Sequence, residues 1–262
     1  MDLHLQDKVA IVTGAGAGIG LAISQALIDE GAKVVGAERN SESVEELKRI
    51  GATGVELDLL DPDAGERIAK AAIEEHGRID VLVNNVGRYP IRDGFLSVTD
   101  AEWEATFDIN LKTMIRTTRA VLPQMVSQES GSIVTITSEV ARQPEHWLVD
   151  YSASKSALLS TSKAISIEFG KKGIRVNCVS PGPIRVPGWE VPGGYMDMLA
   201  AEHGTDHEGG LDHLANEIRR LPLGHIGRPE NVAAVVCFLA SDQAANVTGS
   251  EYAVNGGSQP MI

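Results

Sequence analysis

The chain is poor in cysteine, and the placement of its few cysteines excludes two kinds of site. Only Cys178 and Cys237 occur among 262 residues, and both lie in apolar surroundings (VNCVS and VVCFLA). So few cysteines rule out a disulfide framework and indicate buried thiols in a reducing compartment. Neither has a His or a second Cys at metal-ligand spacing, so no metal site is expected.

The chain also lacks an excess of basic charge and any long apolar run. Its 23 Lys and Arg against 36 Asp and Glu give a net charge of −13, without a basic cluster. This balance argues against nucleic acid or an anionic membrane as a partner. No apolar run approaches the ~20 residues that cross a bilayer, and the opening MDLHLQDKVAIVTG has no secretory signal pattern. We therefore expect a cytoplasmic protein that acts on a small molecule.

What the chain does contain is an alternation of short β-rich runs with longer helical patterns. Strands are expected at 8–13, 33–38, 53–58, 80–85, 132–137, 174–180 and 251–254, and helices at about 18–30, 41–50, 62–76, 100–128, 150–171 and 229–240. Several strands are continuously apolar, as in parallel sheets covered on both faces. The pattern predicts a single α/β domain over residues 1–262: a Rossmann-type, doubly wound, seven-stranded parallel sheet with helices on both faces.

One region, 183–224, interrupts this rhythm. It is rich in Pro and Gly and contains two short helical patterns near 195–203 and 211–220. Long excursions in compact domains are usually functional lids or disordered loops. We interpret residues 185–221 as a substrate lid with a solvated surface. Its three histidines do not share one helical face, which argues against a metal site there.

The segment TGAGAGIG, residues 13–20, follows the first expected strand and opens the first helix. Gly14 allows a tight turn, Gly18 lets the backbone approach a pyrophosphate, and Gly20 permits close helix packing. Free N–H groups at the helix start can then receive phosphates. Because this loop stands at the first strand-helix junction, it predicts a dinucleotide site.

Two neighbouring residues at the end of the second strand bear on which dinucleotide is bound. Glu38 stands 20 residues after Gly18, where a carboxylate can accept hydrogen bonds from both adenosine ribose hydroxyls. A 2′-phosphate at that position would meet like-charge repulsion. Arg39 favours the other cofactor, NADP, because an arginine can accommodate a 2′-phosphate. Weighing Glu38 against Arg39, we predict NAD as the cofactor, with NADP as the less favoured alternative.

The run DYSASKSA places Tyr151 and Lys155 four positions apart, which stacks both side chains on one face of a helix. A free phenol titrates near ~10. A nearby ammonium favours phenolate and makes the tyrosine a usable base. Taken alone, the pair is more often a coincidence of spacing, so its interpretation depends on the rest of the chain.

Several short motifs occur in an order that supplies this context. They are TGAGAGIG, NNVG (84–87), Asn110 in FDINL, Ser138 in TITS, YSASK (151–155), PGPI (181–184) and VNGG (254–257). Together they resemble the short-chain dehydrogenase/reductase family, in its compact single-domain branch. The resemblance covers essentially the whole chain, and it makes a chance origin of the Tyr-Lys pair very improbable.

The resemblance implies an oxidoreductase that transfers a hydride between NAD(H) and a secondary alcohol or ketone. Tyr151 would exchange the proton with the substrate oxygen, and Ser138 would bond that oxygen. Lys155 would hold the nicotinamide ribose and, with the charge of the oxidised ring, lower the phenol's pKa. Asn110 would position a water that links Lys155 to solvent.

The resemblance also implies a cofactor site and an assembly. The cofactor-binding residues would be Gly14, Gly18, Ile19, Gly20, Glu38, Arg39, Asp58, Leu59, Asn85, Gly87, Tyr151, Lys155, Pro181, Gly182 and Ile184. The family commonly pairs its two long helices and last strand across two-fold axes, which implies a homotetramer. Ala17 stands where phosphate-preferring relatives often carry a basic residue, and Val186 replaces a threonine that often bonds the carboxamide or phosphate.

Two other kinds of function remain to be weighed. A non-catalytic nucleotide-binding sensor or scaffold would need no intact proton relay, yet Asn110, Ser138, Tyr151 and Lys155 are all present. A lyase or dehalogenase on the same sheet could dispense with the phosphate glycines and the lysine, which this chain retains. The expected substrate is a partly apolar secondary alcohol or ketone. Candidate pocket residues are Arg88, Tyr89, Glu139, His146, Trp147, Val149, Trp189, Tyr195, Met196 and Met198.

Overall fold

The computed structural model of the chain describes residues 2–258 and contains a seven-stranded, fully parallel sheet with strand order β3-β2-β1-β4-β5-β6-β7. Its central strands β1 and β5 are buried along their whole length, as expected of parallel strands that are covered on both faces. The strands are β1 (Val9–Thr13), β2 (Lys33–Glu38), β3 (Thr53–Glu56), β4 (Val81–Asn84), β5 (Gly131–Ile136), β6 (Ile174–Pro181) and β7 (Glu251–Val254). The predicted fold is therefore confirmed.

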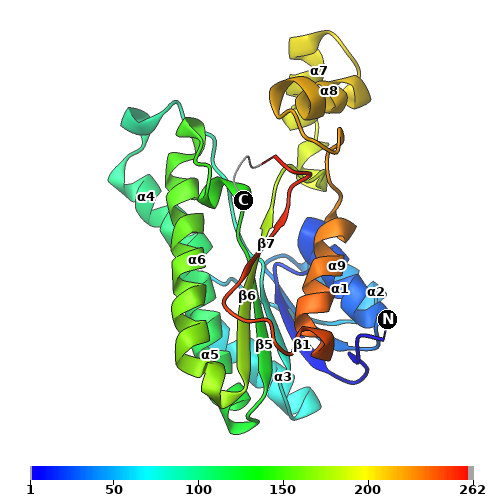
Figure 1. The fold of residues 1–262 in the computed structure, drawn as a ribbon, viewed down its shortest axis with the longest axis vertical. Coiled ribbons are helices and arrows are strands. Elements are labelled where there is room, and N and C mark those ends of the chain that lie inside the picture. Colours follow the sequence, from blue (N-terminus) through cyan, green and yellow to red (C-terminus); the bar gives the residue numbers. More distant parts are fainter. Residues whose placement is uncertain (1, 259–262) are drawn as a thin grey trace.

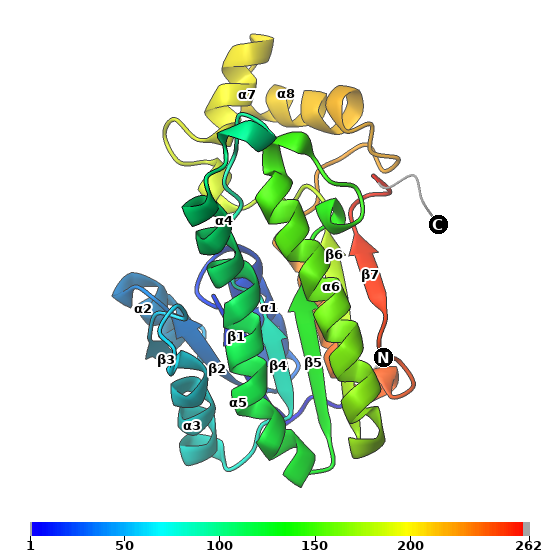
Figure 2. The same ribbon diagram turned by 90° about the vertical axis from the view of Figure 1, so that its left-hand side faces the viewer.

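Helices cover both faces of the sheet (Figures 1 and 2). Ile23 of α1 and Val236 of α9 pack into the core on one face, together with Leu47 of α2. Ile68 of α3 and Met125 of α5 pack into the core on the other face, which α6 also covers. The helices are α1 (Gly18–Asp29), α2 (Ser41–Arg49), α3 (Ala64–His76), α4 (Asp100–Phe107), α5 (Thr113–Ser127), α6 (Val149–Phe169), α7 (Tyr195–His203), α8 (His207–His213) and α9 (Pro229–Ala240).

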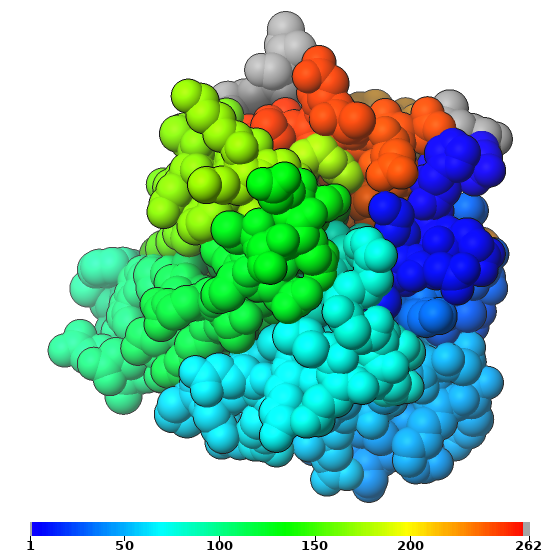
Figure 3. Space-filling view, turned by 90° about the horizontal axis from the view of Figure 1, so that it is seen from below, coloured from blue at the N-terminus to red at the C-terminus, as the bar shows by residue number. Residues whose placement is uncertain are grey.

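The strand order determines where a ligand can bind. The chain runs outward from β1 in one direction as far as β3 and then returns to β4 on the other side of β1, so a topological switch point lies between β1 and β4. Ligands of such sheets bind at this crevice, beyond the carboxyl ends of the strands. In Figure 1, α7 and α8 stand beyond that edge. Figure 3 views the opposite end, where the N-terminal segment, in blue, lies beside the cyan and orange parts of the chain.

The expected helix over 100–128 is interrupted. α4 ends at Phe107, a π-helical turn spans Asp108–Lys112, and α5 begins at Thr113. The turn contains Asn110, whose side chain is buried and bonded to backbone and side-chain groups outside the helix. Such turns are frequent at functional sites because they re-aim one side chain within a continuing helix.

The irregular region also differs from its sequence pattern at its second helix. α7 matches the expected range 195–203, but α8 begins at His207 rather than near 211. The Asp206 carboxylate accepts a hydrogen bond of 2.8 Å from the Gly209 N–H and so caps the helix earlier. The rings of His203 and His213 stack between the two helices, with centroids 3.8 Å apart.

Three further findings concern the chain between residues 2 and 258. No helix in this range combines the length and apolar character needed to span a bilayer. No group of three or more His, Cys, Asp or Glu side chains in the same range gathers closely enough to hold a metal ion. Cys178 and Cys237 are both free thiols and both buried.

Candidate active site

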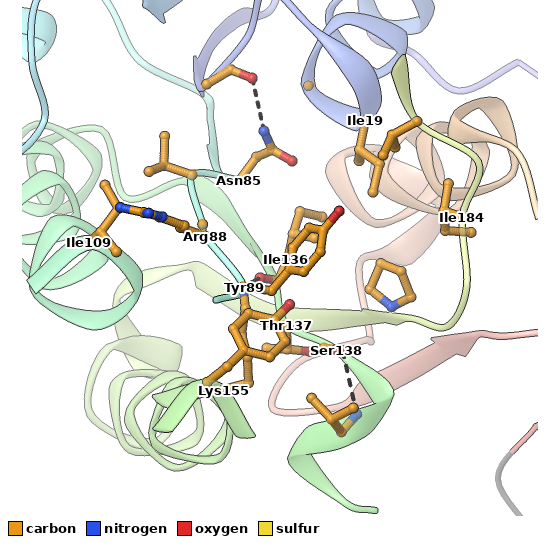
Figure 4. Close-up of a pocket in the computed structure, with 18 of the residues that line it drawn as sticks. Ile19, Asn85, Arg88, Tyr89, Ile109, Ile136, Thr137, Ser138, Lys155 and Ile184 are labelled. Atoms are coloured by element: carbon orange, nitrogen blue, oxygen red, sulfur yellow. Dashed lines mark hydrogen bonds between the residues drawn. The ribbon is translucent and has the colours of Figure 1, made fainter. Parts of the chain in front are cut away.

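A cavity of about 890 Å³ opens at the carboxyl edge of the sheet. The segments that follow β1, β2, β3, β4, β5 and β6 all contribute to its wall, together with residues from 185–221. In Figure 4, Ile19 and Ile184 lie on one side of the cavity, whereas Ser138 and Lys155 lie together on the other. The cavity therefore joins the predicted phosphate end to the predicted reacting end.

The glycine loop has the geometry that its sequence predicts. Gly14 and Gly18 have φ values of +61° and +52°, in the left-handed region that favours glycine. A Cβ at Gly20 would lie 1.8 Å from the Gly14 carbonyl oxygen, so only glycine allows this contact. Ala17, the N-cap of α1, supplies no side-chain hydrogen bond to the helix start. The first N–H donors of α1 thus lack a side-chain cap and fit a phosphate.

Asn85, the residue after β4, secures this loop. Its side-chain amide donates to the Thr13 carbonyl at 3.0 Å and to the Gly14 carbonyl at 2.9 Å, and Figure 4 shows an Asn85 contact as a dashed line. Asn85 therefore bridges β4 and the glycine loop, in addition to lining the cavity.

The predicted adenosine end is formed by residues at the end of β2 and by residues after β2 and β3. Asp58, Leu59, Glu38 and Arg39 all line the cavity. The Glu38 carboxylate accepts hydrogen bonds from the Gly16 N–H at 2.8 Å and from the Arg39 N–H at 3.3 Å. Glu38 is therefore engaged by backbone donors, whereas the Arg39 side chain is exposed at the rim.

The reacting end is carried by α6 and by the turn after β5. Lys155 Nζ lies 5.5 Å from the centroid of the Tyr151 ring, so the pair shares one helical face. Lys155 is buried, and its ammonium donates to the Ile136 carbonyl at 3.0 Å. Ser138 lines the same cavity, and the Tyr89 ring meets the Tyr151 ring edge-on with centroids 6.2 Å apart.

Burial dominates the electrostatics of this pair. It raises the pKa of Tyr151 to about 12, while the hydrogen bond with Ser138 opposes the rise and the neighbouring Tyr89 and Glu139 add to it. It also lowers the pKa of Lys155 to about 8. Both shifts follow from the cost of placing charge in a poorly solvated site. Burial thus outweighs the lowering of the phenol's pKa expected from Lys155, and Tyr151 carries its proton at neutral pH.

Asn110 lies behind the cavity wall. Its side chain accepts from the Arg88 N–H at 2.8 Å and donates to the Arg88 carbonyl at 3.0 Å and to Ser154 Oγ at 3.1 Å. A Cβ placed on Gly87 would lie 3.1 Å from Lys155 Nζ and 3.2 Å from Asn110 Oδ1. The bare backbone at Gly87 therefore leaves Asn110 and Lys155 close to each other.

The end of β6 and the segment after it form the wall predicted for the nicotinamide. Pro181, Gly182 and Ile184 line the cavity. A Cβ on Gly182 would lie 2.8 Å from Glu139 Oε2, so this wall packs directly against the residue after Ser138. Val186 also lines the cavity, and a Cβ on Gly18 would lie 3.6 Å from Val186 Cγ1. Val186 therefore gives the phosphate end an apolar neighbour where a threonine would offer a hydroxyl.

The substrate end combines aromatic and charged walls. Of the candidate pocket residues, the cavity is lined by Arg88, Tyr89, Glu139, Trp147, Trp189 and Tyr195, and not by His146, Val149, Met196 or Met198. Trp189 Nε1 donates to the Tyr89 hydroxyl at 3.0 Å. The sequence reasoning missed Glu145, Leu214 and Arg219, which line this end and come from irregular or π-helical backbone without a clear periodic signal.

A buried carboxylate that the sequence reasoning did not single out stands directly before Tyr151. Asp150 is fully buried, and it accepts hydrogen bonds of 2.7 Å from both Arg92 and Thr106. Arg92 follows β4 and also binds Glu102 of α4 at 2.6 Å. The ion pair ties the start of α6 to the neighbouring layer. The sequence feature that could have pointed to Asp150 is its place as an acidic residue in the first turn of a helix.

A glycine loop at the switch point of a doubly wound sheet, with a Ser-Tyr-Lys group on the same cavity, defines a nucleotide-dependent oxidoreductase. The family model described as enoyl-(acyl carrier protein) reductase matches residues 14–259. The chain belongs to the short-chain dehydrogenase/reductase family, as its motifs predicted.

Known relatives match over nearly the full chain. The dehydrogenase/reductase SDR family member 4 of Oryctolagus cuniculus is 33% identical and covers 98% of this chain and 96% of its own. The 3-oxoacyl-[acyl-carrier-protein] reductase FabG of Thermotoga maritima is 34% identical and covers 97% and 99%. The crystal structure of L-sorbose reductase from Gluconobacter frateurii, complexed with NADPH and L-sorbose, matches with a TM-score of 0.92, at 30% identity and over 100% of both chains.

The comparison corrects the cofactor prediction. The sorbose reductase is in complex with NADPH, so the preference for NAD inferred from Glu38 is wrong. The physical reason lies at the end of β2. The Glu38 carboxylate is turned to the Gly16 and Arg39 N–H groups, which offset its charge, and the Arg39 guanidinium stays exposed at the rim. The residue types alone predict a carboxylate on the ribose, because the Gly16 N–H donor approaches Glu38 only in the folded chain.

Proposed function

We propose that the protein is an NADP(H)-dependent oxidoreductase that interconverts a ketone and its secondary alcohol, with Tyr151 as the acid/base. One observation carries this proposal: the glycine loop, Ser138, Tyr151 and Lys155 border a single cavity. That cavity is large enough for an extended ligand, and its glycine positions leave room for one at the phosphate end. The bound dinucleotide would supply or accept the hydride.

The chain's own residues would handle the proton. A phenol with a pKa raised to about 12 holds its proton at neutral pH, so Tyr151 suits donation to the oxygen of a ketone being reduced. Ser138 would donate a hydrogen bond to the same oxygen and stabilise its developing charge. Lys155 would hold the nicotinamide ribose beside the phenol. Asn110 would keep the backbone at Arg88 in place behind this group.

A direct assay tests the proposal. Purified protein should oxidise NADPH in the presence of a suitable ketone, and L-sorbose and simple cyclic ketones form a first panel. Absence of turnover across a broad panel, with NADPH binding retained, would favour the sensor or scaffold alternative. The Ser138, Tyr151, Lys155 and Asn110 side chains are all present, and Lys155 and Asn110 are buried. This argues for turnover, because a sensor has no use for such a group.

The cavity supports a substrate class with two kinds of surface. Tyr89, Trp189 and Tyr195 offer apolar faces, and the Trp189 and Tyr195 rings meet with centroids 5.1 Å apart. Glu145 and Arg88 offer charged groups that can bond hydroxyls. We therefore infer a ketone or secondary alcohol that carries hydroxyl groups on a partly apolar frame.

Replacing Arg39 should separate the two cofactors. Loss of a charge-assisted hydrogen bond at a 2′-phosphate costs ~1.5–3 kcal/mol, so Arg39→Ala should weaken NADPH binding ~10- to 100-fold. NADH binding should change by less than ~3-fold, because NADH has no 2′-phosphate. Fluorescence titration with both cofactors measures this. Arg49→Ala on the neighbouring helix α2, where the arginine pairs with Glu46, is the charge-matched control. An equal loss for both cofactors would show that Arg39 does not read the phosphate.

Residues 185–221 are proposed to act as a lid over the substrate end. They contribute Trp189, Tyr195 and Arg219 to the cavity wall, and α7 and α8 stand clear of the sheet edge. Hydrogen exchange should slow in this range when NADPH and substrate are both present, because closure would bury its backbone. Equal and strong protection with and without ligands would contradict a lid.

We also propose a homotetramer. The long helices α5 and α6 and the last strand β7 are the elements that the family commonly pairs across two-fold axes. Ile167 of α6 is 73% exposed, which gives that helix an apolar outward position. Light scattering at micromolar concentration measures the mass, and a monomer would contradict the proposal.

A further inference from the structure

An ion-pair cluster crosses the active-site cavity from the lid to the residue beside Ser138. Arg219 Nη2 contacts Glu139 Oε1, and Arg219 Nη1 donates to Glu145 Oε1 at 2.8 Å. The side chains of Glu139, Arg219 and Glu145 are 6%, 20% and 26% exposed. All three line the cavity that Tyr151 borders. The cluster is therefore largely desolvated and close to the reacting group.

The arginine is held in place by its own segment. It follows the π-helical turn Leu214–Ile218, and its N–H donates to the Leu214 carbonyl at 2.8 Å. Leu214 and Ala215 are buried, which anchors this turn. The guanidinium thus reaches Glu139 from a firmly packed end of the region 185–221.

Glu139 is equally constrained on the other side. It follows Ser138 directly, Ser258 Oγ contacts its Oε2, and a Cβ on Gly182 would lie 2.8 Å from that same atom. A carboxylate in this position stands between the Ser138 turn and the predicted nicotinamide wall. Its negative charge opposes the formation of phenolate at Tyr151.

We propose that Arg219 is a positioning residue that holds the Glu139 carboxylate and compensates its charge beside Ser138 and Tyr151. Through Arg219, the lid would thereby influence the charge around the Tyr151 hydroxyl, although Arg219 itself contacts Glu139 rather than Tyr151 or Ser138. This inference rests on the proposed oxidoreductase function and adds to it a residue that influences the proton transfer.

Other charged or titratable groups around Tyr151 help to decide in which direction a change at Arg219 moves the pKa of Tyr151. Lys155 faces it from its own helix, and Tyr89 faces it from the segment after β4. Cys178 of β6 faces Lys155. Asp150, one residue before Tyr151, is paired with Arg92. Arg219 is paired with both Glu139 and Glu145, so its removal should leave the negative charge of these two carboxylates less compensated.

Opposite charge changes should move the pH profile in opposite directions. In Arg219→Met, Glu139 and Glu145 both lose the Arg219 cation, phenolate at Tyr151 becomes harder to form, and the rising limb of kcat/KM for alcohol oxidation should shift ~0.5–1 pH unit to higher pH. In Glu139→Gln, the Arg219 charge is less compensated, and the limb should shift to lower pH. The double variant should return to within ~0.3 pH unit of the wild type.

Two further variants and one binding measurement separate the effect of charge from a loss of structure. Arg220→Met removes the neighbouring exposed lid arginine and should leave the limb unchanged. Arg219→Lys keeps a cation and should retain the wild-type limb even if Arg219→Met folds poorly. NADPH affinity by fluorescence titration should stay within ~2-fold in Arg219→Met and Glu139→Gln if the fold is intact.

The outcomes are distinct. The inference would be overturned if the wild type were active but the rising limbs of kcat/KM in Arg219→Met and Glu139→Gln stayed in place. A shift of both limbs in the same direction would overturn it as well. So would a loss in Arg219→Met confined to KM for anionic substrates, because Arg219 would then bind substrate directly. A wild type without turnover on any ketone or alcohol would instead contradict the proposed function itself.

Discussion

Tyr151→Phe is expected to lower kcat by ~10²- to 10⁴-fold while NADPH still binds, because the change removes one hydroxyl and keeps the ring. The Tyr151 phenol borders the cavity together with Ser138 and Lys155, and we expect it to exchange the proton with the substrate oxygen. The ring itself packs edge-on against Tyr89, and phenylalanine can retain this contact. The loss should therefore fall on the chemical step rather than on folding.

Steady-state kinetics and a fluorescence titration with NADPH measure the two parts of this prediction. Tyr252→Phe, which removes a hydroxyl from β7 outside the cavity lining, is the matched control and should retain wild-type turnover. If Tyr151→Phe retained more than a few per cent of activity, another group would have to be the acid/base.

Lys155→Ala should damage both catalysis and cofactor binding. Loss of a preorganised cation from a desolvated site typically costs ~10²- to 10³-fold in kcat. We also expect NADPH affinity to fall, because the same ammonium would hold the nicotinamide ribose. Lys155 lies buried under the Gly87 backbone with its pKa lowered to about 8. The ammonium is thus present below that pH and is lost above it.

This pKa gives the prediction a pH dependence. The ratio of wild-type to Lys155→Ala activity should be largest below pH 8 and should narrow as the pH rises through about 8, where the wild type loses the same charge. Lys163→Ala, two turns further along α6, removes an exposed ammonium that contacts the Gly249 carbonyl and should have little effect. A variant with normal NADPH affinity and a wild-type pH profile would contradict the dual role.

Much of the fold could be read from local patterns. β2 and β7 occupy the predicted ranges 33–38 and 251–254, and α9 occupies 229–240. Strand-helix alternation fixes the parallel topology because each crossover must pack back onto the sheet with one hand. The glycine loop could also be predicted from a short stretch of sequence. Gly14 and Gly18 are needed for their backbone conformation, and Gly20 for its close approach to Gly14, all within eight residues.

The cofactor preference was misjudged because it depended on hydrogen bonds across the fold. Glu38 and Arg39 are adjacent in sequence, and their order alone favours a ribose ligand. The Gly16 N–H that engages the Glu38 carboxylate comes from another strand-helix junction, 22 positions away in the chain. Two groups so far apart in the chain meet only when the fold packs, so the identities of Glu38 and Arg39 could not reveal this hydrogen bond.

The sequence by itself therefore determined the order of strands and helices, the family, and the spacing of Tyr151 and Lys155 on one helical face, because these depend on neighbours in the chain. Only the tertiary structure decided that Asn110 lies on a π-helical turn, that Arg92 pairs with Asp150 58 positions later, and that Arg219 pairs with Glu139 80 positions before it. Contacts at such separations form only when strands and helices pack, and no local periodicity encodes them.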